Sequence, residues 1–160
     1  MKKLKTLKDI KNLKGKKVLL RVDFNVPISD KGKVKDDTRI VEALPTIKFL
    51  HKKGAKTILI SHLGRPDGKI KEDLKLTHVK KHLEKLLKLK IKKSNEVLGT
   101  ETTKLVNSLK NGEILMLENV RFRAEEEECE KKFTKELASL GDIFVNDAFG
   151  TAHRKHASTA

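Results

Sequence analysis

Short apolar runs rich in β-branched residues alternate along the chain with longer segments of helical periodicity. The short runs lie at residues 18–22, 57–60, 113–117 and 142–145, with a weaker candidate at 89–91. Apolar runs of this length that lack polar alternation are typical of strands buried on both faces. The pattern therefore predicts a buried sheet of four strands, to which the weaker run would add a fifth.

Four segments between these runs place apolar residues three or four positions apart, as one face of a helix requires. Their apolar positions are 40, 44, 47 and 50; 79, 83, 86 and 87; 105 and 109; and 129, 133, 137 and 140. Thr38, Thr77 and Thr100 are N-cap candidates for the first three, and Gly141 is a C-cap signal for the fourth. Pro45 should kink the first helix without ending it. The acidic run 125–130 is interpreted as the first turns of the fourth helix.

Strands that alternate with helices are the signature of βαβ units, whose right-handed crossovers produce a parallel sheet. We therefore predict an α/β fold, a Rossmann-like parallel sheet with helices on both faces. The chain has 160 residues and shows no internal repeat or linker, so we predict a single domain over residues 1–160.

Charge narrows the possible partners. The formal net charge of +15 indicates an anionic partner, but only six of the 37 basic residues are arginine. No apolar run is long enough to cross a membrane, and no apolar segment follows the basic N-terminus. A single cysteine excludes an internal disulfide and suits a reducing compartment. These features predict a cytoplasmic, unexported protein.

Candidate chemistry gathers just after the predicted strands, where ligands bind to open parallel sheets. The segments 21–27, 61–66, 118–123 and 146–154 contain arginine, histidine, aspartate and asparagine side chains. Arg39 follows the predicted cap Thr38, where the helix dipole disfavours a cation, so its presence calls for a ligand. With Arg65, Arg121 and Arg154 it predicts a basic basin for a small, multiply anionic ligand.

These segments resemble a known family. Arg21-Val22-Asp23-Phe24-Asn25-Val26-Pro27, Ser61-His62-Leu63-Gly64-Arg65-Pro66, Glu118-Asn119-Val120-Arg121-Phe122 and Phe149-Gly150-Thr151-Ala152-His153-Arg154 are similar, in order and spacing, to blocks of the N-terminal domain of phosphoglycerate kinases. The resemblance covers essentially the whole chain. It implies phosphoryl transfer between 1,3-bisphosphoglycerate and ADP, giving 3-phosphoglycerate and ATP, in glycolysis.

The resemblance also implies roles for individual residues. Asp23 and Asn25 would contact the hydroxyl and carboxylate end of the glycerate, and Arg39 would approach the phosphoryl group in flight as the catalytic residue. The basic patch for the phosphate would be His62, Arg65, Arg121 and Arg154. Phe24, Leu63 and Gly64 complete the expected substrate-binding positions.

The resemblance implies a second domain as well, because the family holds Mg²⁺ and ATP or ADP there, and neither G-x-x-x-x-G-K-[ST] nor G-x-G-x-x-G occurs here. We expect no metal site in this chain, which would be inactive alone and monomeric. A separate C-terminal chain could complete a split enzyme. Other hypotheses are a glycerate-phosphate binding domain without turnover and a basic nucleic-acid-binding module. Members also return a C-terminal segment onto the first domain, so its absence should expose an apolar patch.

Overall fold

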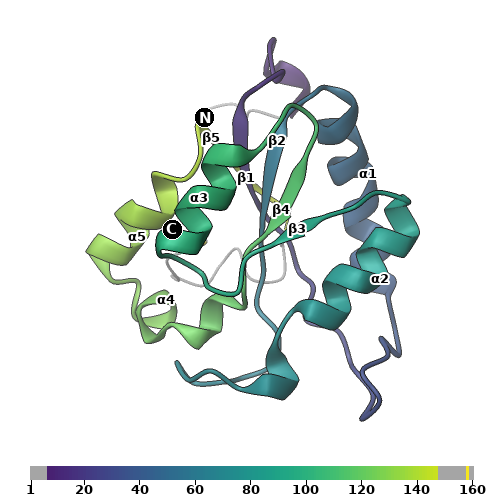
Figure 1. Cartoon of the computed structure of the whole chain (residues 1–160), viewed down its shortest axis with the longest axis vertical. Helices are drawn as coiled ribbons and strands as arrows, with labels where there is room; N and C mark the ends of the chain where they lie inside the picture. The colour runs from purple at the N-terminus through teal and green to yellow at the C-terminus, as the bar shows by residue number, and fades with distance from the viewer. Residues whose placement is uncertain (1–6, 148–157, 159–160) are drawn as a thin grey trace, which may run out of the picture.

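The sheet has five parallel strands in the order β3-β4-β2-β1-β5 (Figure 1). The computed structural model describes residues 7–147 and Ser158. The strands are β1 (Lys17–Arg21), β2 (Lys56–Ile60), β3 (Lys92–Lys93), β4 (Ile114–Met116) and β5 (Ile143–Asn146). In the central register Leu19 lies opposite Ile58 of β2 and Phe144 of β5. The predicted α/β fold with a parallel sheet is confirmed.

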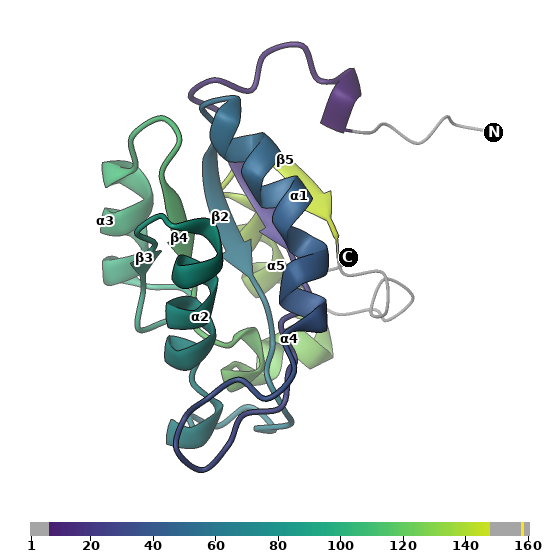
Figure 2. The same cartoon turned by 90° about the vertical axis from the view of Figure 1, so that its right-hand side faces the viewer.

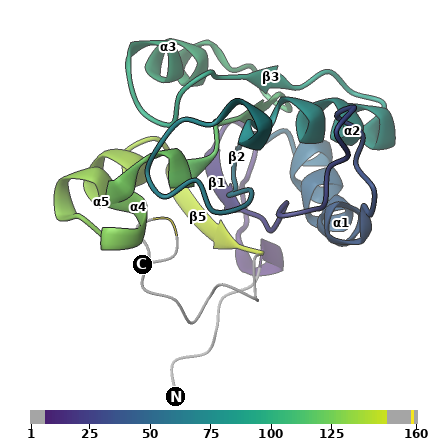
Figure 3. The ribbon, with the colours of Figure 1, turned by 90° about the horizontal axis from the view of Figure 1, so that it is seen from below.

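Helices cover both faces of this sheet, as α1 and α5 on opposite sides of the strands show (Figure 3). They are α1 (Thr38–Lys52), α2 (Thr77–Leu87), α3 (Thr100–Ser108), α4 (Ala124–Glu128) and α5 (Lys131–Ala138). Short 3₁₀ turns lie at Leu7–Asp9, Glu72–Leu74 and Val120–Phe122. None of the helices among the described residues has the length and apolar character needed to cross a bilayer.

Two apolar cores follow from the alternation of side chains along the strands. In β1, Val18 and Leu20 pack with Ile40 and Ile47 of α1, whereas Leu19 faces the other way and packs with Leu137 of α5. Because β1, β2 and β4 each contribute to both cores, their residues are apolar almost without interruption. This arrangement explains why apolar runs, and not an alternating pattern, identified the strands.

Two sequence predictions about the elements are wrong. The weak strand is not at 89–91 but at Lys92–Lys93, where a two-residue edge strand needs no apolar run. The fourth predicted helix is two helices, because Cys129 adopts a left-handed conformation at φ 50° and ends α4. Glu130 then caps α5, accepting hydrogen bonds from the backbone N–H groups of Lys132 and Phe133. Cys129 is therefore not on a helical apolar stripe, and α5 ends at Ala138.

The predicted threonine caps are displaced by one residue. Thr38, Thr77 and Thr100 are each the first residue of a helix, and the capping positions are Asp37, Leu76 and Gly99. Pro45 lies inside α1, as predicted.

Candidate functional site

The loops that follow β1, β2 and β4 meet below the carboxyl ends of the strands (Figure 2), and we call them the strand-end loops: residues 22–37, 61–76 and 117–123. Ser61 joins all three. Its Oγ accepts a hydrogen bond from the backbone N–H of Phe24 at 3.0 Å, and its carbonyl accepts one from Val120 at 3.1 Å. The hydroxyl and the carbonyl of Ser61 therefore hold the three loops against one another.

Asp23 and Asn25 fold the first strand-end loop and connect it to the second. The carboxylate of Asp23 accepts a hydrogen bond from the backbone N–H of Asn25 at 3.2 Å. Asn25 in turn accepts one at its Oδ1 from the backbone N–H of Gly64 at 2.9 Å. Such side-chain to backbone bonds define a turn locally. They bring three predicted site residues together.

Arg39 lies beside these two residues. Its Nη1 is 3.3 Å from the Asp23 carboxylate and donates to the carbonyl of Asn25 at 2.8 Å. Half of the Arg39 side chain is exposed, at 51%. Two acidic residues offset its charge at the start of α1, Asp36 and the capping Asp37. Hydrogen bonds from Thr38 hold the pKa of the Asp36 carboxyl below its usual value. Arg39 is thus a fixed cation that still reaches solvent.

Arg121 is also brought to this edge, but its side chain is largely buried, with 5% of the residue exposed. Its Nη1 donates to the carbonyl of Gly64 at 3.3 Å, and its Nε lies 3.4 Å from the Glu127 carboxylate. Arg121 therefore connects the second and third strand-end loops.

The remaining predicted positions differ in exposure. Phe24 is fully buried, and Leu63 and His62 are each 3% exposed, so their side chains belong to the walls of the site. Arg65 is exposed and has no hydrogen bond or ion pair with another described residue. Arg154 lies outside the described residues. Within them, the structure brings Asp23, Asn25, Arg39, Gly64 and Arg121 into one connected set.

Two buried polar residues support the site, and the sequence analysis did not identify this role for either of them. Asn119, fully buried, donates through Nδ2 to the carbonyls of Leu63 and Leu74 at 2.7 and 3.0 Å. Arg21, 1% exposed, donates to Nδ1 of His62 at 3.0 Å. The available signal was a charged residue inside an otherwise aliphatic strand, since such residues are buried only when paired.

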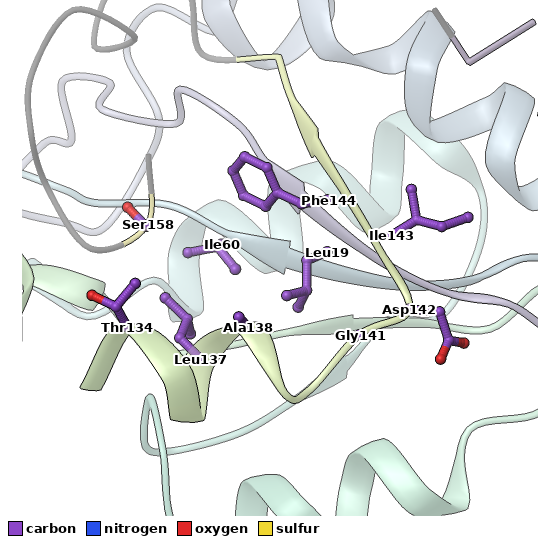
Figure 4. Close-up of a pocket in the computed structure, with 10 residues that line it drawn as sticks. All are labelled: Leu19, Ile60, Thr134, Leu137, Ala138, Gly141, Asp142, Ile143, Phe144 and Ser158. Carbon is purple, nitrogen blue, oxygen red and sulfur yellow. The ribbon is translucent and has the colours of Figure 1, made fainter. Parts of the chain in front are cut away.

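Two grooves flank Asn25. One of about 410 Å³ runs along Pro27, Asp36 and Arg39, and one of about 390 Å³ lies between Ser29, Gly64 and His78. A third groove, of about 220 Å³, lies between α5 and β5 and is mainly apolar (Figure 4). Phe144 is 46% exposed there. The first two grooves are lined by predicted site residues, Asn25 among them, and the third is lined by none of them.

The described residues offer no metal centre, since none of their His, Cys, Asp and Glu side chains form a group of three suited to an ion. His82, which lies four residues after His78 on α2 as paired metal ligands on a helix can, is bound to the Asp37 carboxylate at 2.9 Å through Nε2.

Comparison with known proteins identifies the family of this chain. Residues 7–160 match the family described as phosphoglycerate kinase. The chain is 55% identical over 98% of its length to phosphoglycerate kinase from Dictyoglomus turgidum and 54% identical over 97% to that from Chlorobium limicola. The solved phosphoglycerate kinase from Coxiella burnetii superposes with a TM-score of 0.85 at 40% identity, covering 96% of this chain and 38% of that one. The chain spans about 39% of the length of these two sequence relatives. It belongs to the phosphoglycerate kinase family.

Proposed function

We propose that this chain is the part of a phosphoglycerate kinase that binds 3-phosphoglycerate and 1,3-bisphosphoglycerate for phosphoryl transfer to or from ADP and ATP. The connected set of Asp23, Asn25, Arg39, Gly64 and Arg121 at the strand ends is the observation that supports this most strongly. It combines hydroxyl-binding oxygens with guanidinium groups, as a phosphorylated hydroxy acid requires. Family membership supplies the reaction.

The proposed phosphoryl transfer depends on cationic side chains more than on a general base. In the direction that consumes ATP, the attacking group is a carboxylate, which is already ionised at neutral pH. What accelerates the transfer is positioning and neutralisation of charge on the moving phosphoryl group. Arg39, half-exposed and held by Asp23, is our candidate for that catalytic role. Arg65 and Arg121 would hold the phosphate that is not transferred, together with His62 and Arg154.

The proposal assigns residues 1–160 to one substrate-binding domain and the Mg²⁺-nucleotide to a further domain. The relatives are long enough to contain one, because this chain spans about 39% of their length. We further propose that the enzyme acts in glycolysis in the cytoplasm, as its single cysteine suits a reducing compartment. A separate chain could supply the second domain.

Titration calorimetry with 3-phosphoglycerate tests the proposal. We expect saturable binding at one site, with a modest salt dependence because few charges are neutralised. Arg65→Ala removes a charge-assisted contact and should weaken binding about 10- to 100-fold. Lys8→Ala, an exposed lysine of the Leu7–Asp9 turn, which precedes the amino end of β1, is the matched control. Tight binding of oligonucleotides with no response to 3-phosphoglycerate would favour the nucleic-acid hypothesis instead.

A further inference from the structure

Arg21 is a buried cation at the end of β1, in a strand whose Val18, Leu19 and Leu20 are aliphatic. Each of its three guanidinium nitrogens donates a hydrogen bond. Nε donates to Ser158 Oγ at 2.9 Å, Nη1 to the carbonyl of Val22 at 2.6 Å, and Nη2 to Nδ1 of His62 at 3.0 Å. All three guanidinium nitrogens therefore bind protein atoms, and only 1% of the residue is exposed.

Glu126 balances this buried charge. The carboxylate is fully buried and accepts hydrogen bonds from the backbone N–H of Ser158 at 2.9 Å and from Ser158 Oγ. Ser158 therefore links Glu126 to Arg21. Burial lowers the pKa of Arg21 to about 10, which leaves it charged at neutral pH. Because both Arg21 and Glu126 have defined hydrogen-bond partners, this buried network can fix the positions of the residues around it.

The contact with His62 determines which ring nitrogen carries the proton. A guanidinium has five N–H donors and no acceptor, so the hydrogen bond from Arg21 requires a lone pair on His62 Nδ1. In a neutral imidazole with Nδ1 as acceptor, the proton lies on Nε2. A proton added at Nδ1 would set two N–H groups against each other. His62 is 3% exposed, so its ring is packed among protein atoms.

We propose that Arg21 is a positioning residue that holds His62 as the neutral Nε2–H tautomer, so that the ring donates a hydrogen bond to an anionic oxygen of the bound ligand. The ligand-binding half of this inference rests on the proposed function. A His62 with its proton on Nδ1 would present a lone pair to the anion and repel it. Arg21 thus makes the ring a hydrogen-bond donor without contacting the ligand.

The first test needs no variant. Nitrogen-15 NMR of the imidazole rings distinguishes the two tautomers and the imidazolium by the shifts of Nδ1 and Nε2. At neutral pH, His62 of the wild-type chain should show the Nε2–H form in the absence of ligand. An Nδ1–H tautomer, an equal mixture or an imidazolium would overturn the inference.

The second test separates positioning from folding. In Arg21→Met combined with Glu126→Gln, no unpaired charge stays buried, and Glu126→Gln alone is the matched control that keeps Arg21. We expect the control to keep the Nε2–H tautomer, and the double variant to lose it and to bind 3-phosphoglycerate about 10- to 100-fold more weakly. Thermal unfolding by circular dichroism shows whether each variant is folded.

Replacing Arg21 with and without His62 present distinguishes positioning of the ring from support of the fold. When the same replacement of Arg21 is made in a His62→Ala background, we expect less than a threefold further loss of affinity, because the ring that Arg21 orients is gone. Equal losses in both backgrounds would show that Arg21 only supports the fold. A wild-type chain that has the Nε2–H tautomer but does not bind 3-phosphoglycerate would refute the proposed function while leaving the control of the ring by Arg21 intact.

Discussion

Asn119 offers a sharp test of how the strand-end loops are held. Its side chain is fully buried and makes three hydrogen bonds: Nδ2 donates to the carbonyls of Leu63 and Leu74, and Oδ1 accepts from the backbone N–H of Arg121 at 3.1 Å. Asn119→Ala removes all three and leaves the carbonyl of Leu63 buried without this donor. At a net 0.5–1.5 kcal/mol for each bond, the loss of unfolding free energy should be about 2–4 kcal/mol.

Urea unfolding followed by circular dichroism measures this loss, which corresponds to a fall in Tm of about 5–15 °C for a domain of this size. Asn119→Asp has the same shape and keeps the acceptor for Arg121, but it places an oxygen against the carbonyl of Leu63, so it should be destabilised at least as much. Asn107→Ala, at an exposed position in α3, is the control and should stay within about 0.5 kcal/mol of wild type.

The same substitution should weaken 3-phosphoglycerate binding, because the carbonyl held by Asn119 belongs to the residue before Gly64. The reasoning is refuted if Asn119→Ala costs less than about 1 kcal/mol, or if it destabilises the chain fully while the affinity is unchanged. The second result would mean that the Leu63–Gly64 backbone does not need this support to shape the site.

Three further predictions concern stability and turnover. The backbone N–H groups of Phe133 and Lys132 hold the pKa of Glu130 below its usual value. Its stabilisation is therefore present above pH 4.5 and is lost as the pH falls, so the Tm difference between wild type and Glu130→Ala should shrink from pH 7 to pH 3; a constant difference would contradict this. Gly68→Ala should destabilise by about 1 kcal/mol or more in urea unfolding, because its φ is 76° and the new Cβ would lie 3.0 Å from Ala124 Cα; an unchanged midpoint would contradict this. The purified 160-residue chain should show no ATP-dependent turnover in a coupled assay, since in-line positioning of the donor is worth on the order of 7–11 kcal/mol; sustained turnover would contradict this.

The sequence predicted the sheet well because its central strands are buried on both faces. β1, β2, β4 and β5 overlap the apolar runs that identified them. β3 was misplaced because an edge strand of two lysines carries no apolar signal. The break at Cys129 was missed for a different reason. Residues other than Gly, Asn and Asp seldom adopt the left-handed conformation, so a cysteine gives no signal that a helix ends there, and the apolar spacing continued through it.

The sequence predicted where in the fold the site residues gather better than it predicted which side chains contact one another. The rule that ligands bind beyond the carboxyl ends of strands located Asp23, Asn25 and Gly64 correctly in one cluster. Spacing could not show that Arg121 is mostly buried beside Glu127, since that pairing depends on where α4 packs. Nor could it connect Arg21 with Ser158, which are 137 residues apart in the chain.

Amide NMR during titration with 3-phosphoglycerate tests the proposed binding site most directly. The proposed function predicts that the largest saturable shifts fall on Asn25, Gly64, Arg65 and the first turn of α1 near Arg39. The backbone around Phe144, in the apolar groove between α5 and β5, should change little. Shifts spread over the lysine-rich surface, or confined to that apolar groove, would contradict the assignment of the strand-end loops as the binding site.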